Sequence, residues 1–218
     1  MKSIYCIENM DISEIFYSIQ GEGNWTGLPN IFIRSAGCNL RCSFCDTKYA
    51  YNPNQEMPIS KIVKFINRYN CKYITITGGE PLIQKDIYSL IDVLLNKGYE
   101  ICLETNGSIE IDNLIDKESL MISLDIKCPS SNMNEKMNFN NLKKIGFNDQ
   151  LKFIICDKTD YNYAKNILKK YNIKSSIYFQ PVEGFNIQKI AQWILNDCLN
   201  VKLGLQIHKI IWGNQRGI

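Results

Sequence analysis

Three cysteines stand close together in the segment GCNLRCSFCDT. Cys38, Cys42 and Cys45 have the spacing CxxxCxxC, and three thiolates leave one coordination position of a metal centre open. A zinc ion holding water in that position would favour hydrolysis. A zinc knuckle would instead take a fourth protein ligand from elsewhere in the chain, such as His208 or Cys71.

A 4Fe-4S cluster is the other metal centre that this spacing can hold. Three thiolates would leave one iron free to bind a small chelating molecule and pass it an electron. S-adenosylmethionine (SAM) carries the amino and carboxylate groups needed to chelate that iron. Its one-electron reduction would release an adenosyl radical, so the cysteine segment is compatible with radical chemistry.

Other polar residues are expected at the same place in the fold as the cysteines. Each stands at or just after the C-terminal end of a predicted strand, where parallel α/β folds build their sites. The predicted strand at residues 31–34 leads directly into the cysteine segment. We therefore expect one shared mouth, lined by the cysteines and by Arg34, Thr77, Glu104, Asp125, Lys127 and Gln180.

Apolar, β-rich runs alternate with helical patterns along the chain, which indicates a parallel sheet with helices outside it. Predicted strands cover residues 31–34, 73–77, 99–104, 120–126, 151–156 and 177–180, with a last extended segment at 203–207. Predicted helices cover residues 59–70, 86–96, 161–171 and 187–198. About six such units are too few for an eight-fold barrel, so we expect an α/β fold with a partial, open barrel. Residues 1–218 are expected to form a single domain.

Composition argues against several classes of protein. The 218 residues include 25 basic and 22 acidic side chains, a net charge of +3, without a basic run interleaved with aromatics. Nucleic acid is therefore not an expected partner. The apolar runs have the length of strands, so no membrane span is expected. The N-terminal segment MKSIYCIENMDISE lacks the apolar region of a signal peptide.

The nine cysteines favour a reducing compartment over a disulfide framework. Their number is odd and the chain is not small, so a cytoplasmic location is expected. The cysteines outside the CxxxCxxC segment are expected to be ordinary small buried residues: Cys6, Cys71, Cys102, Cys128, Cys156 and Cys198.

The cysteine segment resembles that of the radical SAM superfamily. Phe44, an aromatic residue directly before the third cysteine, belongs to the same pattern, and residues 77–81 read TGGEP at the end of a predicted strand. In that superfamily a GGEP segment holds the amino group of SAM by backbone carbonyls. The resemblance implies a partial, distorted (β/α)6-type radical SAM barrel with a parallel sheet.

Further segments resemble one family of this superfamily, the 7-carboxy-7-deazaguanine synthases. Residues 14–23, EIFYSIQGEG, are similar to the N-terminal segment of that family, and Cys45-Asp46-Thr47 matches it after the last cysteine. The match continues nearly end to end through ETNG, DIKCPSS, QPVE, QIHK and the final WGNQRGI.

This resemblance implies a lyase of deazapurine and queuosine biosynthesis. Family members convert 6-carboxy-5,6,7,8-tetrahydropterin to 7-carboxy-7-deazaguanine with loss of ammonia. The adenosyl radical takes a hydrogen atom from C6, the ring contracts, and the hydrogen returns, so that SAM is regenerated. The family uses a 4Fe-4S cluster, SAM and Mg²⁺ and is usually a homodimer. A flavodoxin- or ferredoxin-type protein is the expected electron donor.

The resemblance also implies roles for individual residues, with no catalytic residue beyond the cluster and SAM. The cluster would be held by Cys38, Cys42 and Cys45, and Mg²⁺ by the hydroxyl of Thr47. SAM would be contacted by Phe44, Asp46, Gly79, Asn106, Asp125, Lys127, Gln180 and Glu183. The substrate would be contacted by Ile19, Gln20, Gly21, Arg34, Thr77, Glu104, His208 and the chain-terminal carboxylate on Ile218. Arg34 suits an anionic group, and Asp125 stands where many members carry a smaller Ser.

Two other functions stay open at this point. A glycyl-radical activating enzyme would share the cysteine and TGGEP segments, but it would need a protein partner and would not need EIFYSIQGEG. A non-catalytic zinc-binding module would have no role for Gly79 or Gln20. Iron content separates the zinc module from the two enzymes, and turnover of the carboxypterin separates the enzymes from each other.

Overall fold

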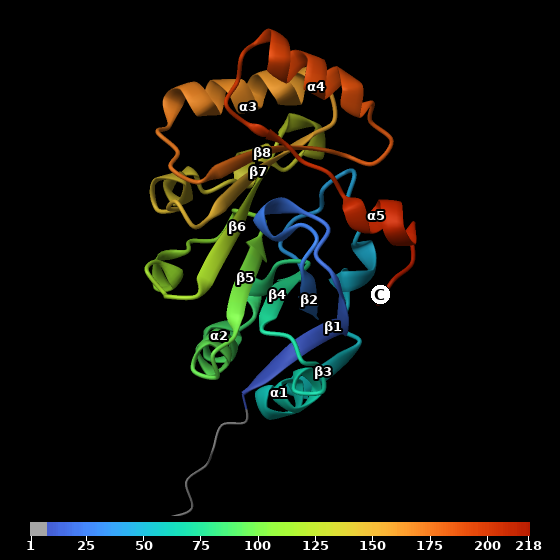
Figure 1. Ribbon diagram of the computed structural model, residues 1–218. Helices are drawn as coiled ribbons and strands as arrows, with labels where there is room; N and C mark the ends of the chain where they lie inside the picture. Colours follow the sequence, from blue (N-terminus) through green and yellow to red (C-terminus); the bar gives the residue numbers. More distant parts are fainter. Residues whose placement is uncertain (1–7) are drawn as a thin grey trace, which may run out of the picture.

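The strands form one sheet in the order β3-β1-β2-β4-β5-β6-β7-β8-β9 in the computed structural model, which describes residues 8–218 (Figure 1). The strands are β1 (Asn9–Ile19), β2 (Pro29–Ser35), β3 (Gln55–Pro58), β4 (Tyr73–Gly78), β5 (Glu100–Thr105), β6 (Leu120–Lys127), β7 (Gln150–Ile155), β8 (Ser176–Pro181) and β9 (Lys202–Leu203). The helices are α1 (Ile59–Ile66), α2 (Ile87–Leu95), α3 (Lys158–Lys170), α4 (Ile187–Asn196) and α5 (Ile207–Trp212).

The central part of the sheet matches the sequence prediction. The six predicted strands correspond to β2 and β4–β8, which are neighbours and all run parallel. The sheet is not closed, since β3 and β9 form its two edges. The α/β fold with a partial, open barrel is therefore confirmed.

The sequence prediction omits β1 and β3, which extend the sheet beyond β2 as antiparallel strands. Their local signal is weak, because the register of β1 shifts between Ile12 and Glu14 and β3 has only four residues. The predicted extended segment at residues 203–207 is wrong, since β9 ends at Leu203 and α5 begins at Ile207. The backbone N–H of Ile207 donates to Gly21 O at 3.0 Å, a contact that no local pattern reveals.

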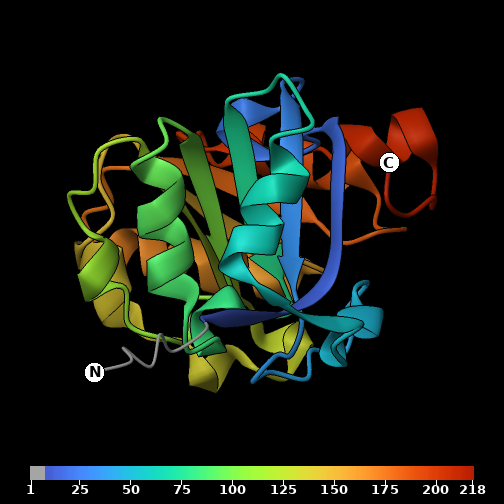
Figure 2. The same cartoon turned by 90° about the horizontal axis from the view of Figure 1, so that it is seen from below.

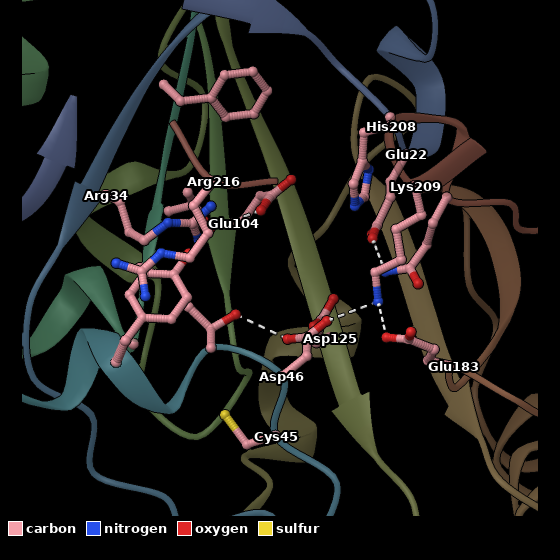
Figure 3. A pocket seen from close by; sticks show the side chains of 18 of the residues that line it. Glu22, Arg34, Cys45, Asp46, Glu104, Asp125, Glu183, His208, Lys209 and Arg216 are labelled. Atoms are coloured by element: carbon pink, nitrogen blue, oxygen red, sulfur yellow. Dashed lines mark hydrogen bonds and ion pairs between the residues drawn. The ribbon is translucent and has the colours of Figure 1, made fainter. Parts of the chain in front are cut away.

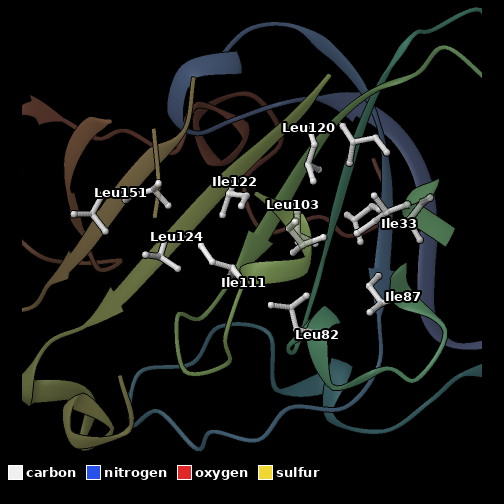
Figure 4. Packing of buried hydrophobic residues seen from close by; sticks show 14 of the residues in the cluster. Ile33, Leu82, Ile87, Leu103, Ile111, Leu120, Ile122, Leu124 and Leu151 are labelled. Carbon is white, nitrogen blue, oxygen red and sulfur yellow. The ribbon is translucent and has the colours of Figure 1, made fainter. Parts of the chain in front are cut away.

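Residues of alternating strand positions face opposite sides of the sheet, and here the two sides differ in chemistry. One side is apolar and fully buried, and together with α1–α4 it forms the hydrophobic core (Figure 4). Each fully buried Ile or Leu there contributes roughly 1.5–3 kcal/mol. A slip of one residue would expose this face, so it sets the register; its strand residues include Ile33, Ile76, Leu103, Leu124 and Leu151.

The opposite side of the same strands is polar near their C-terminal ends. Arg34 on β2 is the register neighbour of Thr77 on β4, and Asp125 on β6 is the register neighbour of Lys152 on β7. Because the helices cover the apolar side, these polar side chains are left facing an open space.

The helices divide into two groups along the sheet (Figures 1 and 2). α2 contacts β5, whereas α3 contacts β7 and α4 contacts β8. α3 and α4 lie against each other, with the rings of Tyr161 and Trp193 5.2 Å apart. Among residues 8–218, none of the helices has the length and apolar composition of a membrane span.

The cysteines outside the CxxxCxxC segment differ in burial. Cys102 and Cys128 are buried as predicted, whereas Cys71 and Cys156 are partly exposed. The prediction is wrong for Cys198, which is exposed because it follows the end of α4 in a left-handed backbone conformation with φ +49°. Cys6 lies outside the described residues.

Candidate active site

A cavity of about 780 Å³ lies at the C-terminal ends of the parallel strands (Figure 3). Its volume falls within the range of small-molecule sites. Every site residue predicted from the sequence lines this cavity, from Ile19 near the N-terminus to Ile218. The structure therefore brings together residues that lie far apart in the sequence.

Cys38, Cys42 and Cys45 are free thiols on the loop that follows β2. The sulfur of Cys38 accepts a hydrogen bond from Leu40 N at 3.4 Å and lies 3.9 Å from Asn106 Nδ2. Burial raises the pKa of the Cys38 and Cys42 thiols. Three partly exposed sulfur ligands on one short loop fit the donor set of a 4Fe-4S cluster with one open iron.

Cys71 lies at the other end of the sheet. Its sulfur is 3.3 Å from Pro29 O at the start of β2, whereas the cysteine loop follows the end of β2. A seven-residue strand separates the two ends by roughly 20 Å, so Cys71 cannot complete a zinc knuckle with the loop cysteines.

The TGGEP segment is bonded to the base of the cysteine loop. Gly79 N donates to Ser35 O at 3.3 Å, and Glu80 N donates to Gly37 O at 2.9 Å. A Cβ atom on Gly79 would lie 2.0 Å from Gly37 O and 2.8 Å from the Cβ of Cys38. Only glycine permits this close approach of the two loops.

Glu80 is fully buried and joins the end of β4 to the end of β5. Its carboxyl oxygens accept hydrogen bonds from Leu82 N at 3.0 Å, Thr105 Oγ1 at 2.8 Å and Asn106 N at 2.6 Å. Burial raises its pKa to about 7 in spite of these donors. Glu80 therefore positions Asn106 beside the cysteine loop.

Replacing Glu80 by Gln is expected to lower the free energy of unfolding by about 1–3 kcal/mol, because an amide nitrogen cannot accept the N–H of Asn106. The pKa of Glu80 is about 7 in the folded protein and 4.5 ordinarily. Protonation of Glu80 therefore stabilises the folded wild type fully below about pH 4.5, and this stabilisation is lost as pH rises through about 7. Urea denaturation should thus show a larger deficit of E80Q at pH 5 than at pH 8. A deficit that grows with pH would show instead that the Glu80 pKa is not raised.

Gln20, Thr77 and Glu104 form a hydrogen-bonded wall of the cavity. Gln20 Nε2 donates to Glu104 Oε1 at 3.3 Å and to Thr75 Oγ1 at 3.1 Å. Thr77 Oγ1 donates to Glu104 Oε2 at 2.8 Å. The wall can therefore present both acceptors and donors to a flat polar heterocycle.

Arg34 lies beside this wall and is held by Glu14. Arg34 Nε is 2.7 Å from Glu14 Oε1, and the hydroxyl of Tyr49 donates to the same oxygen at 2.9 Å. Because only Nε makes this contact, the terminal nitrogens of Arg34 are left for other partners.

A buried charge network lies across the cavity from Arg34. Lys152 Nζ is 3.0 Å from Glu22 Oε2 and 3.2 Å from Asp125 Oδ1, and Lys127 Nζ donates to Asp125 Oδ2 at 2.8 Å. Burial raises the pKa of Asp125, but the charges of Lys127 and Lys152 outweigh it and hold that pKa below its ordinary value. Burial lowers the pKa of Lys152, yet Asp125 and Glu22 raise it well above its ordinary value.

The network contains two of the residues predicted to contact SAM, Asp125 and Lys127, whose charged groups are paired with each other. Lys152 and Glu22 are absent from the predicted site residues. The ion-pair network could have been predicted from the lysine inside the apolar run Leu151-Lys152-Phe153, because lysine is seldom fully buried unless it is paired.

Gln180, at the end of β8, is only 3% exposed. Neither its Nε2 nor its Oε1 has a hydrogen-bond partner among the described residues. Since buried amides are normally satisfied, this cavity-lining side chain fits a site whose ligand completes its hydrogen bonds.

The C-terminal segment packs along one side of the cavity (Figure 3). Lys209 Nζ lies 2.8 Å from Glu183 Oε2 and 3.4 Å from Asp46 Oδ2, so it bridges two predicted SAM contacts. The ring of His208 packs on Gly21, where a Cβ would lie 2.0 Å from Nδ1. Burial lowers the pKa of His208 below its ordinary value.

Comparison with known proteins agrees with these features. Residues 32–171 match the radical SAM superfamily. A protein named 7-carboxy-7-deazaguanine synthase from Thermoplasma acidophilum is 38% identical and aligns over 96% of this chain and 100% of its own. A protein of the same name from Methanospirillum hungatei is 40% identical over 93% of this chain and 85% of its own. Another from Clostridium acetobutylicum is 37% identical over 96% of this chain and 100% of its own.

Two solved structures share the fold. The crystal structure of QueE from Escherichia coli has a TM-score of 0.75 and 23% identity, over 91% of this chain and 94% of that one. The crystal structure of Streptococcus suis SuiB bound to its precursor peptide SuiA has a TM-score of 0.57 and 13% identity, over 79% of this chain and 47% of that one. At these identities the similarity concerns the fold alone.

Proposed function

The chain belongs to the radical SAM superfamily and, within it, to the family of 7-carboxy-7-deazaguanine synthases, and from this premise we propose how its cavity carries out the reaction. The enzyme is a lyase that converts 6-carboxy-5,6,7,8-tetrahydropterin to 7-carboxy-7-deazaguanine with loss of ammonia. One observation carries the assignment: the cysteine loop, the TGGEP segment and the Gln20–Thr77–Glu104 wall meet in a single cavity.

The residues present fit the cofactors of this family. When bound, a 4Fe-4S cluster and SAM supply the one-electron chemistry that takes a hydrogen atom from the substrate. Cys38, Cys42 and Cys45 would hold the cluster, and the unpartnered amide of Gln180 supports SAM binding beside it. The other proposed SAM contacts are Phe44, Asp46, Gly79, Asn106, Asp125, Lys127 and Glu183.

The substrate would lie against the wall on the β1 and β2 side of the cavity. The Glu104 carboxylate can accept hydrogen bonds from the amino and ring N–H groups of a pterin, and Gln20 and Thr77 hold that carboxylate in place. Arg34 would bind the anionic group of the substrate. The further proposed substrate contacts, which also line the cavity, are Ile19, Gly21, His208 and the chain-terminal carboxylate on Ile218.

Five finer properties belong to the same proposal: a Mg²⁺ site, the electron donor, a homodimer, a one-domain chain and a cytoplasmic location. Thr47 Oγ1 lies 2.8 Å from Asp46 Oδ1, and we assign Mg²⁺ to this hydroxyl because oxygen ligands suit a hard cation. The electron donor would be a flavodoxin- or ferredoxin-type protein, and the active form a homodimer of one-domain chains. A reducing cytoplasm would keep the three cluster thiols available.

The deciding experiment is product analysis by mass spectrometry. Anaerobically reconstituted protein is mixed with SAM, Mg²⁺, a strong reductant and 6-carboxytetrahydropterin. We expect 7-carboxy-7-deazaguanine without proportional loss of SAM. Steady release of 5′-deoxyadenosine without this product would favour a glycyl-radical activating enzyme, and a colourless zinc protein would favour the binding module. Neither alternative is favoured by relatives that match along nearly the whole chain.

A further inference from the structure

The cations that line the cavity differ in whether a carboxylate neutralises them. Lys127, Lys152 and Lys209 all form ion pairs, and Arg34 pairs with Glu14. Arg216 also lines the cavity, but it forms no ion pair with any residue among 8–218. An anion that enters the cavity therefore meets in Arg216 a cation for which no protein carboxylate competes.

Arg216 is held in place by an aromatic ring. Its guanidinium carbon lies 3.9 Å from the centroid of Tyr49, and the guanidinium carbon of Arg34 lies 5.9 Å from the same centroid. Stacking on a ring occupies the face of a guanidinium and leaves its N–H edge free for hydrogen bonds. The Tyr49 hydroxyl is bonded to Glu14, so the ring has a defined position between the two arginines.

The backbone after α5 turns at two glycines that flank this arginine. Gly213 has φ +62° and Gly217 has φ +73°, both in the left-handed region that favours glycine. Gly213 ends α5, and the turned segment brings Arg216 to the cavity from a helix whose other contacts reach Gly21, Asp46 and Glu183.

We propose that Arg216 is a specificity-determining residue, whose guanidinium binds the 6-carboxylate of the substrate together with the terminal nitrogens of Arg34. This inference rests on the proposed function. Arg34 is the register neighbour of Thr77, so the pair lies on the side of the cavity assigned to the substrate. The cluster and SAM would instead be held beside the cysteine loop, by Cys38, Cys42 and Cys45. Two arginines with free edges match the planar geometry of a carboxylate.

Equilibrium dialysis of 6-carboxypterin and of its uncharged 6-carboxamide against the reconstituted holoenzyme tests this proposal. Arg216→Ala should weaken binding of the carboxylate roughly 10- to 100-fold and leave binding of the carboxamide nearly unchanged. Arg216→Lys should fall between the two, since an ammonium group lacks the bidentate fork. Arg68→Ala is the matched control, because Arg68 stacks on Phe65 at 4.9 Å outside the cavity, and it should bind both ligands like the wild type.

Two results would overturn the proposal. An equal loss for the carboxylate and the carboxamide would mean that Arg216 only orders the C-terminal segment. A weakened affinity for SAM, with the pterins unaffected, would mean that Arg216 serves the carboxylate of the cofactor. If the wild type binds 6-carboxypterin in an Arg216-dependent way but yields no 7-carboxy-7-deazaguanine from 6-carboxytetrahydropterin in the product analysis, the proposed function fails and the anion site stands.

Discussion

Replacing Cys42 by Ser is expected to leave the protein folded but to remove its iron–sulfur absorbance and its turnover. Cys42 packs only partly against the core, so a serine of similar size should be tolerated there. Iron–sulfur clusters are held by thiolates, and a serine hydroxyl leaves two sulfur ligands on the loop. The loss should exceed the roughly 10- to 100-fold effect of removing an outer-shell partner of a metal ligand.

Cys198→Ser is the matched control for this variant. Cys198 is also a free cysteine, but it is exposed after the end of α4 and does not line the cavity. The C198S variant should retain the iron–sulfur absorbance, the iron content and the turnover of the wild type. A C42S protein that keeps its full iron content and activity would contradict the assignment of the cluster to this loop.

Replacing Lys152 by Met is expected to lower the free energy of unfolding by about 3–5 kcal/mol, because it leaves largely buried carboxylates without their cation. The Lys152 side chain is 5% exposed, and those of its partners Glu22 and Asp125 are 17% and 18% exposed. Asp125 keeps Lys127 as a partner in this variant, whereas Glu22 keeps only the hydrogen bond from Gln206 at 2.6 Å. Glu22 therefore accounts for most of the expected loss.

A second substitution tests whether Glu22 accounts for most of the loss of stability. Adding Glu22→Gln to K152M should recover a large part of the lost stability in urea denaturation, because it removes the unpaired buried charge. Lys165→Met is the control, since Lys165 and Asp197 form a pair of the same kind at 2.7 Å with more exposed side chains. That change should cost less than about 1 kcal/mol. If K152M costs no more than K165M, the buried network contributes little to folding.

Local patterns in the sequence were enough to predict the chemistry of the site and the positions of the parallel strands. The cysteine spacing and the TGGEP segment are such patterns, because residues close together in the sequence stay close together in any fold. The six central strands are also local, because each is an apolar run with turn residues after it. Parallel strands present their sites at their C-terminal ends, and this rule alone predicts that Arg34, Thr77 and Glu104 share one mouth.

Which charges meet inside that mouth depends on the tertiary structure. The pairing of Lys152 with Asp125 requires the register of β6 against β7, and its pairing with Glu22 joins positions far apart in the chain. The placement of Arg216 over Tyr49 requires the return of α5 to the cavity. These contacts gain their energy from burial and from neighbours that come together only on folding, so no short segment of the sequence carries their signal.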